Sequence, residues 1–117
     1  MSRRDPTVTV REMLDFVEEA RTLAAGHSRD DLGRDLAFTR SSERVIELIG
    51  EAAKRLPQEI RDAAKSVKWS EVIGMRNQLI HAYHTISHDI VWDVLQNKLD
   101  ALEDALREVL RKLQGAR

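Results

Sequence analysis

The chain has 117 residues, of which 42% are hydrophobic and 33% are charged, and its formal net charge is -1. This length fits a single domain, and the lack of cysteine excludes both a disulfide framework and a thiolate metal site. The near-neutral charge weakens the case for nucleic-acid binding without excluding it, because any such binding has to come from a local basic patch. No apolar run approaches the ~20 residues of a membrane span, and the amino terminus lacks the apolar core of a signal peptide, so we expect a cytoplasmic protein.

The first predicted helix covers residues 9–25. Thr9 and Glu12 have the Ser/Thr-x-x-Glu spacing of a capping box. Apolar residues recur at steps of three and four, the periodicity of an amphipathic helix: Val10, Met13, Leu14, Val17, Ala20 and Ala24. Gly26 supplies the left-handed conformation that ends such a helix, which leaves His27 as a surface residue beside the turn.

A second, longer helix is predicted between Ser28, a suitable cap, and Pro57, which cannot continue a helix. Its apolar residues begin at Leu36 and keep a helical period, and Gly33 is a place where the helix could kink. Gly50 lies in the helix interior, where glycine costs about 1 kcal/mol relative to alanine. The missing side chain there predicts close packing against a neighbouring helix.

Two further helices are predicted between Pro57 and Ser87. A short helix starts at Pro57 and runs through Ala64. The next helix has Trp69 as an anchor and Ser70 as its cap, and we expect it to end at about Tyr83–Thr85.

The last predicted helix is capped by Ser87. Its apolar residues alternate steps of four and three through most of the segment, as in a helical bundle: Leu95, Leu99, Leu102, Leu106, Val109 and Leu113. We therefore predict an all-α, up-and-down four-helix bundle with additional short helices. It forms a single domain over residues 1–117, with its core at about 8–113.

Residues 75–84 hold most of the reactive side chains, including two of the four histidines and the only tyrosine. Successive helical residues are about 100° apart, so Arg76 and Tyr83 share one column while Asn77 and His81 share another. Arg76 and His81 are then separated by about 140° around the helix. They could meet at one phosphate only if the arginine folds around, the helix unwinds or a second subunit supplies one group.

These side chains suit cleavage of an RNA phosphodiester without a metal ion. His81 could take the proton from a ribose 2′-hydroxyl or give one to the leaving oxygen, and Arg76 could hold the phosphate. Asn77 and Tyr83 could orient the phosphate or a base, and His84 could act only if it turns towards the same cavity. The plainer interpretation places Arg76 in an ion pair and His81 in the core, because this spacing alone arises easily by chance.

Metal binding is not favoured by the sequence. His84 and His88 are four residues apart and could bind zinc, but no third ligand has a suitable spacing, and a turn between them would spoil the geometry. A surface or capping role for His88 is the alternative. Tyr83 is either packed with its hydroxyl satisfied or exposed and open to modification.

Arg76, Asn77, His81 and Tyr83 together resemble the R-x-x-x-x-H-x-Y motif of HEPN-domain proteins. The resemblance is to the HepT-like toxins, which pair with a small MNT-type nucleotidyltransferase antitoxin. Other segments are similar to the family in the same order along the chain, over roughly residues 8–113: Ile49–Ala53, Trp69–Asn77 and Val91–Trp92.

The resemblance implies a HEPN-like bundle that forms a homodimer with two motifs at one cleft, which would bring Arg76 and His81 together. It implies the toxin of a HEPN/MNT toxin-antitoxin system, an endoribonuclease acting on RNA with Arg76 and His81 as catalytic residues and Asn77 as a supporting residue. The enzyme itself would need no cofactor, whereas the antitoxin would use ATP to adenylylate Tyr83 and so block the cleft. The alternative is a noncatalytic HEPN module that binds a nucleotidyltransferase partner or nucleic acid.

Overall fold

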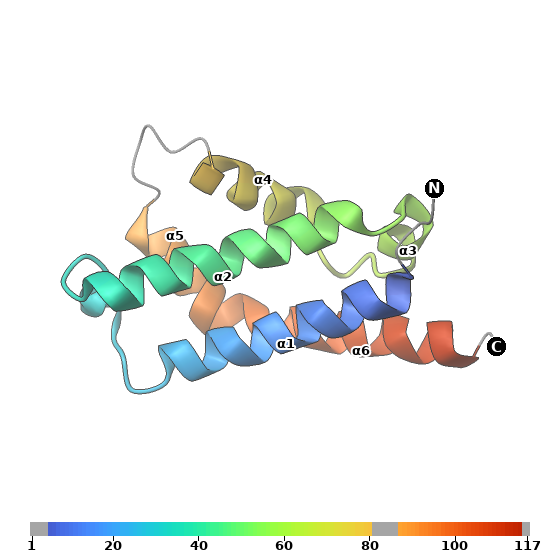
Figure 1. The fold of residues 1–117 in the computed structure, drawn as a ribbon, viewed down its shortest axis with the longest axis horizontal. Coiled ribbons are helices and arrows are strands. Elements are labelled where there is room, and N and C mark those ends of the chain that lie inside the picture. The colour runs from blue at the N-terminus through green and yellow to red at the C-terminus, as the bar shows by residue number, and fades with distance from the viewer. Residues whose placement is uncertain (1–4, 81–86, 116–117) are drawn as a thin grey trace.

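The computed structural model describes residues 5–80 and 87–115, with the backbone alone for residues 78–80. All regular structure in these ranges is helical, which confirms the predicted fold class (Figure 1). The long helices run alternately up and down: α1 (Pro6–Ala24), α2 (Leu36–Arg55), α4 (Trp69–Ile80), and a continuous last helix made of α5 (His88–Asp93), the π-helical η2 (Val94–Lys98) and α6 (Leu99–Gly115). Two short pieces connect them: η1 (Arg29–Asp31) and α3 (Gln58–Ala63).

The helices pack in an order that leaves one side of the bundle more open than the others. α1 packs against α2 and α6, and α2 packs against α4. In Figure 1, α4 lies beside α2 on the side away from α1. The last helix, α6, runs along α1. α4 is therefore held in place mainly by α2.

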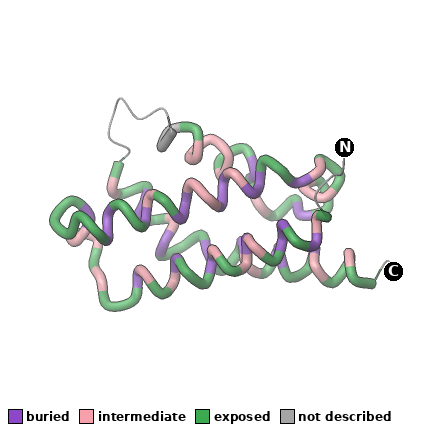
Figure 2. Tube along the Cα trace, viewed as in Figure 1, coloured by how far each residue is buried: buried purple, intermediate pink, exposed green. Residues whose placement is uncertain are grey.

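The hydrophobic core follows the inner faces of these helices, as the buried positions in Figure 2 show. Met13 and Val17 of α1 and Leu106 of α6 are at most 1% exposed. Each such side chain contributes about 1.5–3 kcal/mol when it is fully buried. The apolar stripes predicted for the first and last helices are thus confirmed.

Within the described ranges, no helix is both long and apolar enough to cross a membrane.

α1 begins earlier than predicted. The Asp5 side chain accepts a hydrogen bond from the backbone N–H of Thr7 at 2.9 Å, and Pro6 occupies the first helical turn. Proline favours that position because its fixed φ already suits a helix and its missing N–H would have had no partner. The predicted capping box at Thr9 is therefore wrong, since Thr9 lies inside the helix and is only 2% exposed. Gly26, with φ 80°, does supply the predicted left-handed turn.

The chain breaks between Ser28 and α2 instead of forming one kinked helix. Ser28 caps only the short turn η1, and Gly33 has φ 93°, which stops a helix. Asp35 then starts α2 by accepting a hydrogen bond from the backbone N–H of Phe38 at 3.0 Å. Because the helix starts so late, Leu36 lies on its first turn and is 66% exposed, in contrast to its predicted place in the apolar stripe.

Trp69 anchors the start of α4, as predicted. Its indole N–H donates to the main-chain oxygens of Arg61 at 3.0 Å and Ala64 at 3.2 Å, and its ring is buried. This fixes Trp69 itself in the first turn of α4, so Ser70 lies inside the helix and is not its cap. The helix that carries the reactive stretch is thereby tied to the end of α3.

The last helix begins at the predicted cap, where Ser87 accepts a hydrogen bond from the backbone N–H of Asp89 at 3.2 Å. Arg29 of η1 pairs with Asp89 at 2.6 Å and so holds this end against η1. The π-helical turn η2 was not predicted, because the alternation of apolar steps in the sequence does not reveal one wider turn.

An ion-pair network across α1 and α6 makes the stability of the fold depend on pH. Arg21 donates to Asp100 at 2.6 Å and to Glu103, which also accepts from Arg107 at 2.7 Å. The hydrogen bond from Arg107, followed by that from Arg21, lowers the pKa of Glu103. A carboxyl with a lowered folded pKa stabilises the fold above its unfolded pKa, about 4.3, and loses this effect as the pH falls through the folded value.

Replacing Arg21 with methionine is therefore expected to lower the free energy of unfolding at pH 7 by about 1 kcal/mol, the upper range for partly exposed ion pairs. The difference from the wild type should shrink when the pH falls below about 4. Urea unfolding at pH 7 and pH 3 measures both values. Arg111→Met, which removes a pair within α6 alone, is the control and should have the smaller effect. A difference that is the same at both pH values would contradict this account.

Candidate active site

Arg76 lies on α4 directly over Gly50 of α2. A Cβ atom added to Gly50 would lie 2.2 Å from the Cβ of Arg76 and 3.0 Å from its Cγ. It would also lie 3.0 Å from the main-chain oxygen of Val72, one turn earlier on α4. The missing side chain at Gly50 thus lets the two backbones approach closely, which confirms the packing predicted for this glycine and sets the position of Arg76.

Neighbours on both helices hold the guanidinium group of Arg76. Its Nη1 donates to Oδ1 of Asn77 at 2.8 Å, and its Nη2 lies 3.9 Å from Oε1 of Glu51 on α2. The Nε atom is buried and has no hydrogen-bond partner among the residues that the structure describes. The side chain is only 19% exposed, so its stem is enclosed between α2 and α4.

The ion pair that the plainer interpretation expects for Arg76 is therefore present. This ion pair does not use all the N–H donors of Arg76. A guanidinium has five such donors, and a separation of 3.9 Å is a charge contact, not a hydrogen bond. Asn77 is exposed beside it. The structure thus brings together two of the four predicted site residues, with donors left over for an anionic group.

The other predicted site residues, His81 and Tyr83, lie outside the described residues, as does His84. The described part of α4 ends at Ile80, immediately before His81. The predicted separation of Arg76 and His81 around the helix axis thus stays a prediction. So does the predicted end of this helix at Tyr83–Thr85.

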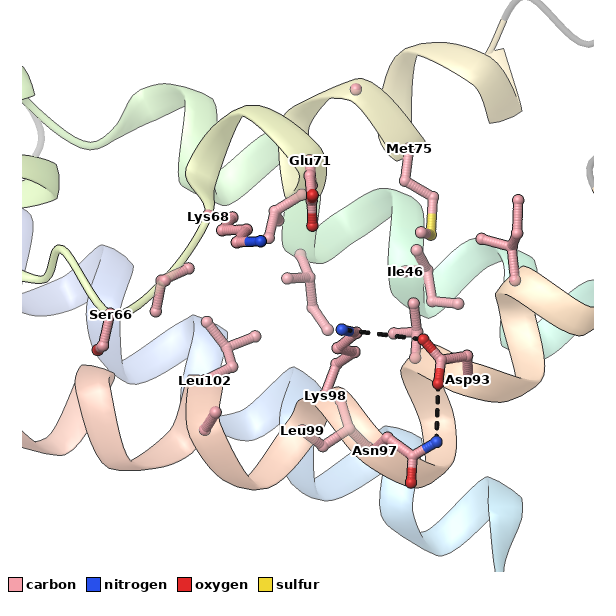
Figure 3. A pocket seen from close by; sticks show the side chains of 17 residues that line it. Ile46, Ser66, Lys68, Glu71, Met75, Asp93, Asn97, Lys98, Leu99 and Leu102 are labelled. Atoms are coloured by element: carbon pink, nitrogen blue, oxygen red, sulfur yellow. Dashed lines mark hydrogen bonds and ion pairs between the residues drawn. The ribbon is translucent and has the colours of Figure 1, made fainter.

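A groove of about 620 Å³ lies between α4 and the continuous last helix (Figure 3). Its walls are mostly apolar and include Met75 of α4 and Leu102 of α6. The π-helical turn adds Lys98, whose Nζ lies 3.9 Å from Oδ2 of Asp93. Arg76 is not among the residues that line this groove. The groove is thus a separate feature, on the side where α4 and α6 do not pack tightly.

Both described histidines have structural neighbours. The ring of His88 lies against Gly33, where an added Cβ would be 2.9 Å from its Cε1 atom. His27 stacks on Phe38 with ring centroids 4.0 Å apart, and its Nδ1 is 3.1 Å from Asp31. His27 is therefore partly packed and not the plain surface residue that we expected. In residues 5–80 and 87–115, no group of three His, Cys, Asp or Glu side chains could hold a metal ion.

Glu51 is a site residue that the sequence did not reveal. Its carboxylate reaches Arg76 from another helix, 25 positions earlier in the chain by residue number. The available signal was its position directly after Gly50, since a glycine that admits a neighbouring helix places the next side chain at the edge of that contact. Glu51 also lies in the segment Ile49–Ala53 that resembles the family, but that resemblance assigns it no role at the site.

Comparison with known proteins places the chain in a family. Residues 13–109 match the family described as Ribonuclease HepT-like. A candidate RNase from Caldanaerobacter subterraneus subsp. tengcongensis is 39% identical over 87 residues, which cover 74% of this chain and 78% of that protein. A candidate RNase from Methanocaldococcus jannaschii is 27% identical over 99 residues, covering 85% of this chain and 82% of that protein.

A third relative, from Thermococcus cleftensis, is named as a probable ribonuclease HepT and is 27% identical over 97 residues, covering 80% of this chain and 88% of that protein. No solved structure matches the chain. The family match spans α1 to α6 and includes Arg76, Asn77, His81 and Tyr83. The chain therefore belongs to the family of HepT-like ribonucleases within the HEPN superfamily.

Proposed function

We propose that this chain is the toxin of a HEPN/MNT toxin-antitoxin system, an endoribonuclease that cleaves RNA without a metal ion. The observation that carries the proposal is the guanidinium of Arg76, fixed between α2 and α4 in a member of a ribonuclease family. An arginine held in this way can bind a phosphate and offset the charge that develops on it during cleavage.

The proposed reaction is an attack of the ribose 2′-oxygen on the adjacent phosphorus, which forms a cyclic phosphate and breaks the bond to the 5′-oxygen. One proton leaves the 2′-hydroxyl and one reaches the leaving 5′-oxygen. His81 is assigned to one of these transfers, because an imidazole titrates near neutral pH. A homodimer that places two copies of the motif at one cleft would supply a second histidine for the other.

Replacing His81 with alanine tests this assignment. We expect kcat for RNA cleavage to fall by about 10²–10⁴-fold, the usual contribution of a general acid or base, and growth inhibition to be lost. The control is His88→Gln, which changes a histidine that packs against Gly33 and should leave cleavage near the wild-type rate. Equal cleavage by His81→Ala and the wild type would remove His81 from the mechanism.

Tyr83 is proposed as the residue by which the partner silences the toxin. A nucleotidyltransferase antitoxin would transfer AMP from ATP to the tyrosine hydroxyl and release pyrophosphate. The added anionic group would oppose RNA phosphate by its charge and its bulk. Intact mass after incubation with the antitoxin and ATP should show a gain of one or more AMP groups, and Tyr83→Phe should show none. A gain that survives in Tyr83→Phe would place the modification elsewhere.

The groove beside α4 favours a second candidate, a noncatalytic module that holds a nucleotidyltransferase partner. Mostly apolar concave surfaces are suited to binding. This candidate predicts a stable complex with the partner and no cleavage of RNA by the purified chain. The cleavage assays above therefore separate the two functions.

A further inference from the structure

Glu51 and Arg76 form a contact that links two helices at the candidate site. The Glu51 carboxylate lies 3.9 Å from Nη2 of Arg76, and the two side chains are 34% and 19% exposed. Gly50, the residue before Glu51, lies directly against the Cβ and Cγ atoms of Arg76. Two consecutive residues of α2 therefore determine where the arginine lies: one admits its stem and the other attracts its charged end.

The contact is suited to orienting the arginine more than to stabilising the fold. An arginine side chain has many rotamers, and holding its planar group in one place requires contacts at more than one nitrogen. Asn77 binds Nη1 from the same helix, and Glu51 attracts Nη2 from the opposite helix. Partly exposed ion pairs contribute little to folding, so the loss of this one should leave the chain folded.

The negative charge of Glu51 does not prevent binding of a phosphate. The carboxylate is about one-third exposed, so water and salt screen its repulsion of a phosphate at longer range. A guanidinium has five N–H donors, which is more than the two contacts of Arg76 use.

Resting on the proposed ribonuclease function, we infer that Glu51 is a positioning residue for Arg76, one that keeps its remaining donors at a fixed place for the RNA phosphate. The carboxylate acts through its charge, because 3.9 Å is too long for a hydrogen bond. Glu51→Gln should therefore lose the effect, although glutamine has nearly the same shape as glutamate. Aspartate keeps the charge at a longer distance and retains part of the effect, since a charge interaction weakens only gradually with distance.

Steady-state cleavage of a mixed-sequence RNA oligonucleotide, with purified protein, tests this role. For Glu51→Gln we expect kcat to fall about ten- to a hundredfold, as for a misplaced catalytic group, while KM changes by less than about threefold. Glu51→Asp should have an intermediate kcat. The matched control is Glu12→Gln, which breaks another Glu–Arg contact between helices, to Arg55 at 4.0 Å, with a similarly exposed glutamate. Its kcat should equal that of the wild type.

A second measurement does not depend on cleavage. The Nε–H signal of Arg76 in an NMR spectrum should report an ordered side chain in the wild type and in Glu12→Gln, and a more mobile one in Glu51→Gln. A wild-type kcat in Glu51→Gln, or an equally ordered Arg76 signal, would overturn the positioning role. Loss of cleavage in Arg76→Ala together with wild-type cleavage in Glu51→Gln would reject this inference alone. Wild-type cleavage in Arg76→Ala would reject the proposed function and this inference with it.

Discussion

Arg76→Ala is expected to lose RNA cleavage by about 10²–10³-fold in kcat while the chain keeps its fold. The magnitude is that of removing one preorganised group that stabilises developing charge, about 2.7–4 kcal/mol. The fold should survive because the atom that lies closest over Gly50 is the Cβ of Arg76, and alanine keeps that atom. Steady-state cleavage and a thermal unfolding curve on the same preparation measure the two effects.

Two variants show whether the loss belongs to the site. Arg76→Lys keeps a positive charge but not the planar fork of donors, so it should recover only part of the rate. Arg55→Ala removes a more exposed arginine of α2, paired with Glu12, and should cleave like the wild type. A fully active Arg76→Ala, or one that has unfolded, would show that Arg76 serves the structure and not the reaction.

Gly50→Ala is expected to destabilise the protein, although alanine is normally the better helix former. The new Cβ would lie 2.2 Å from that of Arg76 and 3.0 Å from a backbone oxygen of α4. α4 would have to move away from α2, and such overpacking costs about 1–3 kcal/mol, more than the ~1 kcal/mol that alanine gains in helix propensity. A drop of several degrees in Tm should accompany a loss of cleavage of at least about tenfold, because Arg76 moves with α4.

Gly74 offers a matched control on α4 itself. Apart from its own stretch of helix backbone, a Cβ added there meets no atom of the described residues within 4 Å. Gly74→Ala should therefore gain about 0.5–1 kcal/mol in stability from helix propensity alone. Opposite changes in Tm for Gly50→Ala and Gly74→Ala are the expected result. If both variants became more stable, the close contact at Gly50 would not hold α4 as described.

The sequence predicted the class of fold because hydrophobic periodicity and helix stops are local signals. Pro57 ended α2 where expected, Ser87 capped the last helix, and Trp69 anchored α4. The predicted starts of α1 and α2 were wrong because each helix has two suitable cap residues in the sequence. Asp5 caps α1 in place of Thr9, and Asp35 caps α2 in place of Ser28. Only the three-dimensional packing decides between neighbouring caps of similar strength.

The candidate site was predictable only in part, for a related reason. Arg76 and Asn77 are adjacent in the sequence, and the motif points to both. Their contact with Glu51 depends on α2 and α4 packing together, and sequence spacing carries no signal for such a contact. Gly50 gave the one clue, since an interior glycine predicted a close helix contact without saying which helix would fill it.

The angular separation of Arg76 and His81 along one helix continues to favour a site shared between two chains. Arg76 is held against α2, so it has little freedom to fold around α4 towards the face where His81 is predicted. A second copy of the motif would provide the missing group without distorting either helix. Under this proposal, each chain contributes half of a ribonuclease site.

The products test most directly whether protein side chains cleave RNA without a metal ion. Purified wild-type chain, incubated with RNA in excess chelator, should still cleave and should leave 2′,3′-cyclic phosphate and 5′-hydroxyl ends that mass spectrometry identifies. The wild type should leave these ends, and Arg76→Ala should not. Cleavage that stops when the metal is removed, or that leaves 5′-phosphate ends, would contradict it.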